Sequence, residues 1–414
     1  MTSTVSNVAP VHGGLESPVD RIDSSAAQRT HLPKVEVNEV DRTTLYRVAD
    51  GTLSPLTGPM GEAEYASVLG RRAIERAGAD WAWTIPIVLP VTDAEARECT
   101  AGAEVGLWHA GEMFGTLAVS DCYDWDKAEL IRAVYGTERT DHPGARLWTE
   151  DPRARLVGGE IRLVPFADAR PFAERVMSPV VTRKLIEARG WEQSIAFQTR
   201  NPLHRAHEYA LVYGAEVILK NGKKTGVVLN PLVGQLKGDD VPAATRMRTY
   251  EVLVEKRLLG EGDMDAALWK RMGQDLNDQL ELVGLDMRMY YGGPCEAVMH
   301  AIYRQNLGFT HFIIGRKHAD APYDDGTPIW GDFDAQEIFR NLGGELAIQT
   351  VNVGFAAYFE EIGRVGLNEH NKGNTVVAIS GTRVREQLLA GEIPDARIMR
   401  PSTAEILVDY YRSK

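Results

Sequence analysis

The sequence is poor in cysteine and in positive charge. Its 414 residues include only three cysteines, Cys99, Cys122 and Cys295, which are far apart and form no CxxC pair. Neither a disulfide framework nor a cysteine-rich zinc site is therefore expected. Lys and Arg total 46 against 58 Asp and Glu, giving a net charge of −12. This balance argues against a surface built for nucleic acid, but it allows a local basic pocket for a small anion.

Long apolar segments and targeting signals are also missing. No apolar run approaches the roughly 20 residues that cross a bilayer. Residues 1–20 lack both the basic and the apolar region of a secretory signal. Together with the cysteine usage, this predicts a cytoplasmic protein that does not associate with membranes. The Ser, Thr, Gly and Pro content of residues 1–33 predicts a disordered tail.

The rest of the sequence has an ordinary globular composition, with 44% hydrophobic and 25% charged residues. Residues 34–172 predict a mostly-β domain, because short branched and aromatic runs are bounded by Gly, Asp and Pro. These runs occupy residues 83–91, 103–110 and 113–123. Apolar spacing over residues 61–78 predicts one helix in this domain.

After Pro165 the pattern changes to that of an α/β protein. Over residues 173–344, helix-like stretches alternate with short apolar runs, which is typical of a parallel sheet with crossover helices. Residues 345–414 predict a smaller α/β lobe that ends in a helix. In such sheets ligands bind beyond the carboxyl ends of the strands, so polar residues at those ends are the candidate site.

The first candidate segment is Gln-Thr-Arg-Asn at residues 198–201, followed by His204 and His207 at the start of an amphipathic helix. A helix N-terminus favours an anion, and Arg200 adds a planar donor fork suited to phosphate or sulfate. The two histidines are three residues apart and could donate hydrogen bonds to a phosphoryl oxygen. Half of a zinc site, or two unrelated surface histidines, are the alternatives.

Two further segments follow expected strands. Gly315 precedes the cationic run Arg316, Lys317 and His318, for which a solvated basic turn is the alternative. The second segment contains Ser380, Thr382 and Arg385 before a helix, and here simple helix capping is the alternative.

Three such strand ends in one sheet suggest a nucleoside triphosphate and a second anion. No acidic cluster marks a metal cage, so Mg²⁺ is expected to arrive mostly on the phosphates. No Ser–His–Asp or Cys–His arrangement points to a covalent intermediate. The residues therefore indicate nucleotidyl transfer by positioning and charge stabilisation.

The segment QTRNPLHRAHE over residues 198–208 resembles the signature of the ATP sulfurylases, the sulfate adenylyltransferases. The resemblance runs over almost the whole chain. LSPLTGPMGEAEYASVL at residues 53–69 resembles the family's PUA-like N-terminal domain. YYGGPCEAVMHAIYRQNLGFTHFIIGR at residues 290–316 and ISGTRVREQL at residues 379–388 resemble its Rossmann-like catalytic domain. No adenylylsulfate-kinase domain, which bifunctional relatives carry, is expected.

The resemblance implies adenylyl transfer from ATP to sulfate in a homo-oligomer. It also assigns roles by position. Sulfate would be held by Gln198, Arg200 and the backbone of Ala319. The active-site stretch would be Thr199, Arg200 and Asn201, with His204 and His207 contacting the ATP phosphates. Further nucleotide contacts would come from Gln198, Asn201, Gly315, Arg316, Lys317, His318, Ala356, Ser380, Thr382 and Arg385.

Three positions depart from the family pattern. The family usually has an acidic residue where Lys317 stands, an Arg where Cys295 stands, and Pro-Phe where Asn352-Val353 stands. We expect Lys317 to contact the triphosphate rather than to face Asp320 or another carboxylate. The departures motivate an alternative: a divergent adenylyltransferase for another oxyanion or a phosphonate-like acceptor. A regulatory protein that kept the fold and lost turnover is a further alternative, as is RNA binding through the PUA-like domain.

Overall fold

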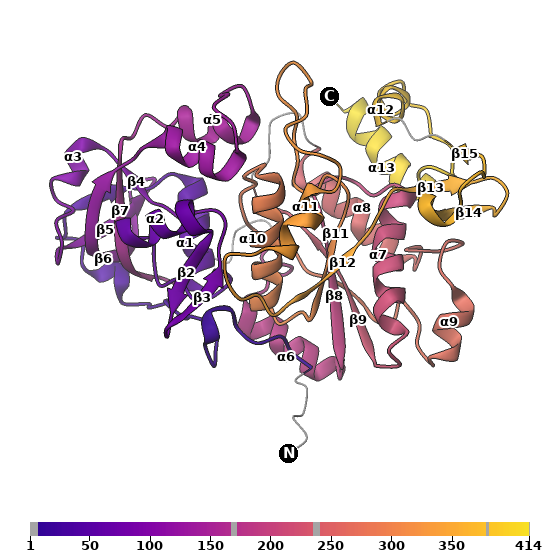
Figure 1. Cartoon of the computed structure of the whole chain (residues 1–414), viewed down its shortest axis with the longest axis horizontal. Coiled ribbons are helices and arrows are strands. Elements are labelled where there is room, and N and C mark those ends of the chain that lie inside the picture. The colour runs from indigo at the N-terminus through magenta and orange to yellow at the C-terminus, as the bar shows by residue number, and fades with distance from the viewer. Residues whose placement is uncertain (1–6, 167–171, 235–240, 378–380, 414) are drawn as a thin grey trace.

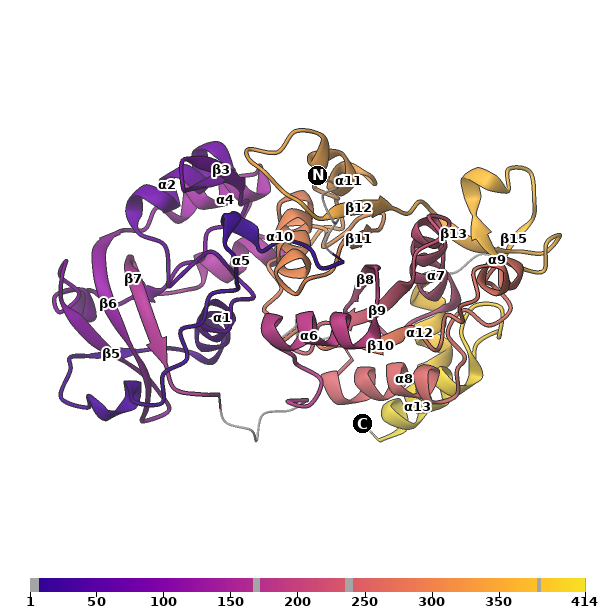
Figure 2. The same ribbon diagram turned by 90° about the horizontal axis from the view of Figure 1, so that it is seen from below.

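The computed structural model describes residues 7–166, 172–234, 241–377 and 381–413. The chain forms two α/β bodies side by side, the N-terminal one in indigo to purple and the larger one in magenta to yellow (Figure 1). Helix α10 of the larger body faces the N-terminal body in both views (Figure 2). Among the described residues, no helix is long and apolar enough to span a bilayer.

The N-terminal body is built on a five-stranded sheet with the strand order β1-β5-β6-β7-β4. All its strand pairs are antiparallel except β1 with β5. Its apolar core includes Phe114, Leu117 and Val119 of β6, and buried and exposed positions alternate in that strand only over residues 117–120. Its elements are η1 (His12–Gly14), η2 (Ala26–Gln28), β1 (Lys34–Glu36), α1 (Glu39–Ala49), α2 (Glu62–Arg71), β2 (Ala73–Arg76), β3 (Ala79–Ala82), β4 (Pro90–Val91), α3 (Asp93–Ala96), β5 (Glu104–His109), β6 (Glu112–Asp124), α4 (Lys127–Tyr135), α5 (Pro143–Thr149) and β7 (Arg155–Leu163).

Two local predictions in this body are corrected. The helix expected over residues 61–78 ends at Arg71, because Arg72 adopts a left-handed conformation with φ 54° and caps it. The chain then forms the hairpin β2–β3, which turns at Ala77 and Gly78 with φ values of 52° and 78°. Of the strand expected over residues 83–91, only β4 is regular.

The predicted disordered tail is wrong for the described part of residues 1–33. Val8 and Val11 are buried, and the N–H of Ala9 donates to the carbonyl of Gly308 at 2.9 Å. His12 is fully buried, and its N–H donates to Asn306 Oδ1 at 2.9 Å. The polar composition suggested disorder, but these few apolar residues bury enough surface to fix the segment across both bodies.

The larger body contains a parallel sheet with the order β10-β9-β8-β11-β12. Alternate strand residues point to opposite faces: Ile195 and Phe197 pack with α7 and α8, whereas Ala196 packs with α6 and α10. Both faces are therefore covered by helices. The elements up to β12 are α6 (Pro179–Arg189), β8 (Gln193–Thr199), α7 (Arg205–Leu219), β9 (Thr225–Pro231), α8 (Ala243–Glu255), α9 (Ala266–Arg271), β10 (Leu280–Leu282), α10 (Gly293–Asn306), β11 (His311–Ile314), α11 (Asp334–Glu337), η3 (Ile338–Arg340) and β12 (Gln349–Asn352).

The strand order reverses direction at β8, because β9 lies on one side of it and β11 on the other. The carboxyl ends of β8 and β11 therefore flank the topological switch point, where open α/β sheets bind ligands. Strand β12 completes this sheet, so residues 349–352 of the predicted C-terminal lobe belong to the main body.

The remaining elements form the C-terminal region beyond the main sheet (Figure 1). A small antiparallel sheet has the order β14-β13-β15, and α13 packs against α8. The third candidate segment follows β15, so it is attached to this small sheet and not to the main one; the expectation of three strand ends in one sheet is wrong on this point. The elements are β13 (Ala356–Phe359), β14 (Arg364–Leu367), η4 (Asn368–His370), β15 (Val376–Val377), α12 (Gly381–Leu389) and α13 (Pro401–Arg412).

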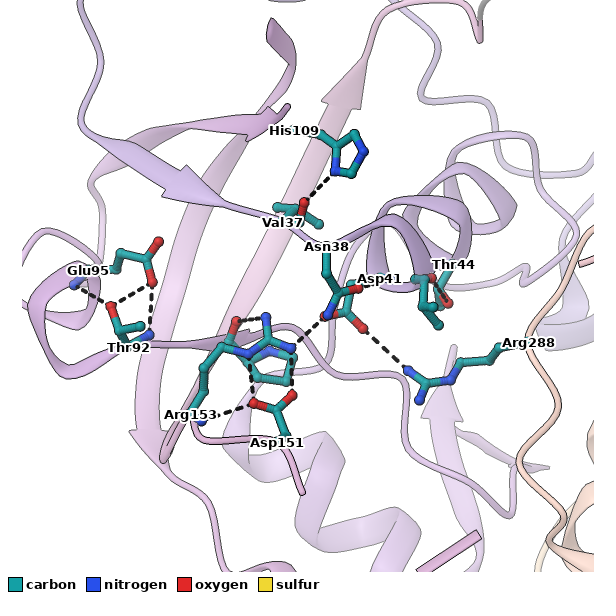
Figure 3. Close-up of polar contacts among 12 residues, drawn as sticks. Val37, Asn38, Asp41, Thr44, Thr92, Glu95, His109, Asp151, Arg153 and Arg288 are labelled. Carbon is teal, nitrogen blue, oxygen red and sulfur yellow. Dashed lines mark hydrogen bonds and ion pairs between the residues drawn. The ribbon is translucent and has the colours of Figure 1, made fainter. Parts of the chain in front are cut away.

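An ion-pair network connects the two bodies (Figure 3). Asp41 in α1 is 5% exposed and accepts from Arg153 at 2.8 Å and from Arg288 at 3.3 Å. Arg288 belongs to the segment before α10, so this carboxylate joins the N-terminal body to the larger one.

Candidate active site

A cavity of about 450 Å³ lies at the switch point. Its walls are the end of β8 and the loop after it, the start of α7, the loop after β11, the segment that enters β13, Met289, and Val384 of α12. The structure thus brings together most of the predicted site residues. The lining residues are Phe197, Gln198, Thr199, Arg200, Asn201, His204, Ala206, His207, Ala210, Met289, Gly315, Arg316, Lys317, His318, Ala319, Val353, Gly354, Phe355, Ala356 and Val384.

The loop after β8 is held rigidly from inside. Thr199 Oγ1 donates to the carbonyl of Asn201 at 2.9 Å and accepts from its N–H at 3.2 Å. The buried guanidinium of Arg246 donates to the carbonyl of Arg200 at 3.2 Å, and the hydroxyl of Tyr250 donates to that of Asn201 at 2.9 Å. The Thr199 hydroxyl is therefore engaged within the loop that it shapes, whereas the neighbouring side chains face the cavity.

Arg200 presents an unused donor to the cavity. Its Nη2 donates to the carbonyl of Asp320 at 3.2 Å, and its Cζ lies 5.1 Å from the centre of the Tyr291 ring. Its Nη1 is buried and has no hydrogen-bond partner within the described part of the chain. The same is true of Gln198 Oε1. Buried polar atoms without partners are costly, so this pair is suited to a polar ligand.

His204 and His207 stack against each other, with ring centroids 3.7 Å apart. His204 is the N-cap of α7, and its Nδ1 accepts from the N–H of His207 at 3.3 Å. Burial lowers the pKa of His207 to about 4. Burial, and secondarily the neighbouring His207, lower the pKa of His204 well below its usual value. Both rings are therefore neutral near pH 7, and His204 carries its proton on Nε2, where it can donate.

The loop after β11 carries the cationic run. Arg316 Nη1 donates to Asp332 Oδ2 at 2.9 Å, and Lys317 Nζ lies 3.7 Å from Asp332 Oδ1. Lys317 thus faces a carboxylate, although not Asp320, while it also lines the cavity. Lys317 and Ala319 have φ values of 50° and 56°, so both adopt the left-handed conformation that favours glycine. The contact of Lys317 with a triphosphate stays a prediction.

His318 contacts a buried polar group formed by His300 and Glu296. Its Nε2 lies 3.0 Å from His300 Nδ1, and His300 Nε2 lies 3.3 Å from Glu296 Oε1. Burial raises the pKa of Glu296 to about 7, although two backbone N–H donors oppose the shift. Burial lowers the pKa of both histidines well below the usual value. The loop after β11 therefore rests on neutral imidazoles supported by a carboxyl group on α10.

The third segment is only partly described. Ser380 lies outside the described residues, and of Thr382 only the backbone in α12 is described. Arg385 belongs to the same helix, whose Val384 reaches the cavity, and Ala356 lines it from β13. Arg385 is not among the lining residues, so its phosphate contact stays a prediction.

Sequence reasoning missed the residues that contact the cavity-lining side chains and loops from the interior of the protein. Arg246, Glu296, Tyr291 and His300 are far from residues 198–207 in sequence, and their contacts arise only in the folded chain. One available signal was the i, i+4 spacing of Glu296 and His300, which places both on one face of a helix. In the described residues, no group of three or more His, Cys, Asp or Glu could hold a metal ion, so no third ligand joins the histidine pair there.

A doubly wound parallel sheet whose switch-point pocket is lined by arginine, lysine and histidine side chains is typical of the nucleotide-binding α/β proteins, a class that includes the nucleotidyltransferases. The chain belongs to the ATP-sulfurylase family: residues 173–410 match that family, and residues 10–165 match the PUA-like domain. The predicted family and fold class are thus confirmed. The predicted domain limits 34–172, 173–344 and 345–414 stay predictions.

Several relatives match along almost their whole length. A sulfate adenylyltransferase from Pyropia yezoensis is 62% identical, with 99% of both chains covered. One from Symbiobacterium thermophilum is 35% identical, covering 97% of this chain and 96% of the relative. A solved structure, a hexameric APS kinase from Thiobacillus denitrificans, has a TM-score of 0.69 at 21% identity, covering 98% of this chain and 68% of that one. This likeness supports the fold.

Proposed function

We propose that this protein is a sulfate adenylyltransferase, which converts ATP and sulfate to adenylyl sulfate and diphosphate. One observation carries the proposal: the unpartnered Nη1 of Arg200 shares a cavity with a stacked, neutral histidine pair at the start of α7. A tetrahedral dianion fits the arginine, and phosphates fit the helix N-terminus. The names of the full-length relatives support the same reaction.

In the proposed reaction, a sulfate oxygen forms a bond to the α-phosphorus of ATP. The bond from that phosphorus to the oxygen bridging to the β-phosphate breaks, and diphosphate leaves with the electron pair. No proton transfer is needed, because the attacking oxygen and the leaving group are both anionic. This accounts for a site that contains neutral imidazoles instead of a titrating base.

The proposed roles are those that the family resemblance assigns. Gln198, Arg200 and the N–H of Ala319 would orient sulfate. His204, His207 and Arg316 would donate to phosphate oxygens as charge grows on them. The other residues expected to hold the nucleotide are Asn201, Gly315, Lys317, His318, Ala356, Ser380, Thr382 and Arg385.

Magnesium is proposed to enter with ATP, because the described residues offer no protein cage for it. When bound, it would neutralise charge on the β- and γ-phosphates. A homo-oligomer in the cytoplasm stays the expectation, and light scattering on the purified protein would give the number of subunits.

The test is sulfate-dependent diphosphate release with ATP and Mg²⁺, measured over a panel of oxyanions that includes selenate, molybdate and a phosphonate. We expect sulfate to give the highest kcat/KM among the natural oxyanions. A phosphonate that exceeds sulfate by about tenfold would instead establish the divergent-acceptor alternative, which Lys317 motivates. Cys295 supports that alternative less, because it is buried in α10 and is not among the residues that line the cavity.

A further inference from the structure

The segment from Arg288 to Gly292 runs from the domain interface to the cavity. Met289 lines the cavity, and Tyr291, only 3% exposed, has its ring 5.1 Å from Arg200 Cζ. This segment has no assigned role in the reaction proposed above. It forms part of the cavity wall and also touches the PUA-like domain.

The PUA-like domain contacts the segment at Tyr290 through a hydrogen bond and a ring stack. The hydroxyl of Tyr135 donates to the carbonyl of Tyr290 at 2.9 Å and accepts from the indole N–H of Trp148 at 3.0 Å. The Trp148 and Tyr290 rings stack, with centroids 5.7 Å apart and an interplanar angle of 16°. Arg288 adds its ion pair to Asp41 of α1 (Figure 3).

The larger body fixes the other side of the segment. The buried carboxyl group of Glu296 accepts from the N–H of Tyr290 at 2.8 Å and from the N–H of Gly292 at 3.0 Å. Gly293 N–H donates to the carbonyl of Ala319 at 3.2 Å, which ties the segment to the loop after β11. Between these bonds Tyr291 is held in the left-handed region, with φ 54°. A non-glycine residue persists there only where its surroundings impose the conformation.

We infer that Tyr291 is a positioning residue, whose buried ring holds the guanidinium of Arg200 in the orientation that receives the acceptor anion, and that the PUA-like domain sets the place of that ring. The inference rests on the proposed function for the identity of the anion. An arginine over a desolvated ring is attracted to its face and loses rotational freedom. One side of Arg200 is thereby fixed, while Nη1 is left for the ligand.

The experiment compares Tyr291→Leu with Tyr291→Phe in the full-length enzyme. The leucine variant loses the aromatic face, whereas the phenylalanine variant keeps it. We expect Tyr291→Leu to raise the KM for sulfate about tenfold and to change the KM for ATP less than about twofold. Tyr291→Phe should stay within about twofold of the wild type in both. Tyr323→Leu is the matched control, because the Tyr323 ring lies 3.8 Å from Arg139 Cζ and is outside the cavity lining.

A second readout separates this inference from the proposed function. The Tm is measured with and without sodium sulfate at constant ionic strength, with Arg200→Ala giving the non-specific part. A sulfate-specific rise in Tm that occurs in the wild type and in Tyr291→Phe but not in Tyr291→Leu supports the inference. This holds even if the enzyme releases no diphosphate. The absence of diphosphate release would by itself refute the proposed function. The inference is overturned by equal KM changes for ATP and sulfate, by normal kinetics in Tyr291→Leu, or by no specific rise in the wild type.

Discussion

At the scale of single residues, the cavity is defined by polar atoms that the described part of the protein leaves without partners. Arg200 Nη1, Gln198 Oε1 and His207 Nδ1 are all buried in this way. A folded protein tolerates such groups where a ligand completes their hydrogen bonding. Each group can be tested by removing it, because its contribution should appear in catalysis more than in stability.

Arg200→Ala should lower kcat/KM for sulfate by about a hundredfold to a thousandfold, because a charged donor aimed at the reacting anion is lost. The fold should remain, since the side chain donates only one hydrogen bond to a described backbone group. Steady-state kinetics and a thermal melt measure the two effects. Arg248→Ala is the control, because Arg248 is exposed on α8 and pairs with Glu255. An Arg200→Ala rate above half that of the wild type would contradict the assignment.

His207→Asn should lower kcat by about a hundredfold, more than it weakens ATP binding, because phosphate charge grows mainly in the transition state. The pKa of His207 is lowered to about 4 by burial, so its ring should stay neutral from pH 8 down to about 5. The ratio of wild-type to His207→Asn rates should therefore be flat over that range. A step in this ratio near pH 6.5 would show that a protonated ring takes part.

Lys317→Asp should weaken ATP binding about tenfold or more, since it reverses two units of charge beside the expected phosphates and adds a second carboxylate near Asp332. Direct titration with the ATP analogue that cannot be cleaved at the α-phosphate measures this affinity. An unchanged ATP affinity with an altered preference among oxyanions would instead place Lys317 in the acceptor site.

These residues also show how far the sequence alone could be used. The segments 198–207 and 315–319 could be predicted, because each is contiguous and follows an apolar run. The supporting groups could not be predicted. Arg246, for example, supports the site by donating to the carbonyl of Arg200, which is 46 residues away in the chain. The orientation of Lys317 depends on Asp332, which reaches it only through the tertiary structure.

At the scale of elements, the errors arose where backbone conformation overrode apolar spacing. The spacing of residues 61–78 is compatible with one helix, but left-handed residues at Arg72 and Ala77 divide it into α2 and a hairpin. The parallel sheet was easier to predict, because its strands are buried on both faces and alternate with long helices.

The contact between α1 and the segment before α10 gives a prediction about stability. Asp41→Asn should lower the free energy of unfolding by about 1–3 kcal/mol, since two mostly buried arginines lose their shared counter-charge. Urea unfolding measures the change. Asp124→Asn is the control: it breaks a pair with Arg155 in which the Asp124 side chain is 89% exposed, so almost no change is expected. Equal effects of the two substitutions would rule out a special role for the network.

At the scale of the whole molecule, the protein buries several histidines in neutral form. Burial lowers the pKa of His12 to about 4 and those of His300 and His318 well below the usual value. These residues lie in the N-terminal segment and beneath the cavity, so protonation would disturb the contact between the two bodies and the site in the larger one. Loss of activity and loss of structure at low pH should therefore occur together.

The contribution of His12 to this acid sensitivity can be measured by replacing it. The folded chain binds this proton only near pH 4, whereas the unfolded chain binds it near pH 6.5, so the unfolded state carries more protons between these values. The contribution of His12 to stability is therefore complete above about pH 6.5 and is lost as the pH falls towards 4. Its slope approaches about 1.4 kcal/mol per pH unit.

His12→Gln should lower the pH dependence of the free energy of unfolding by about 1.4 kcal/mol per pH unit, which corresponds to one proton, because glutamine does not titrate. This holds whatever the substitution does to the stability at pH 7.5. Urea unfolding at several values between pH 7.5 and 4.5 gives the slope for each variant. His31→Gln is the matched control, since the His31 side chain is exposed in the folded chain. If the two variants have the same slope, the buried His12 is not a source of the acid sensitivity.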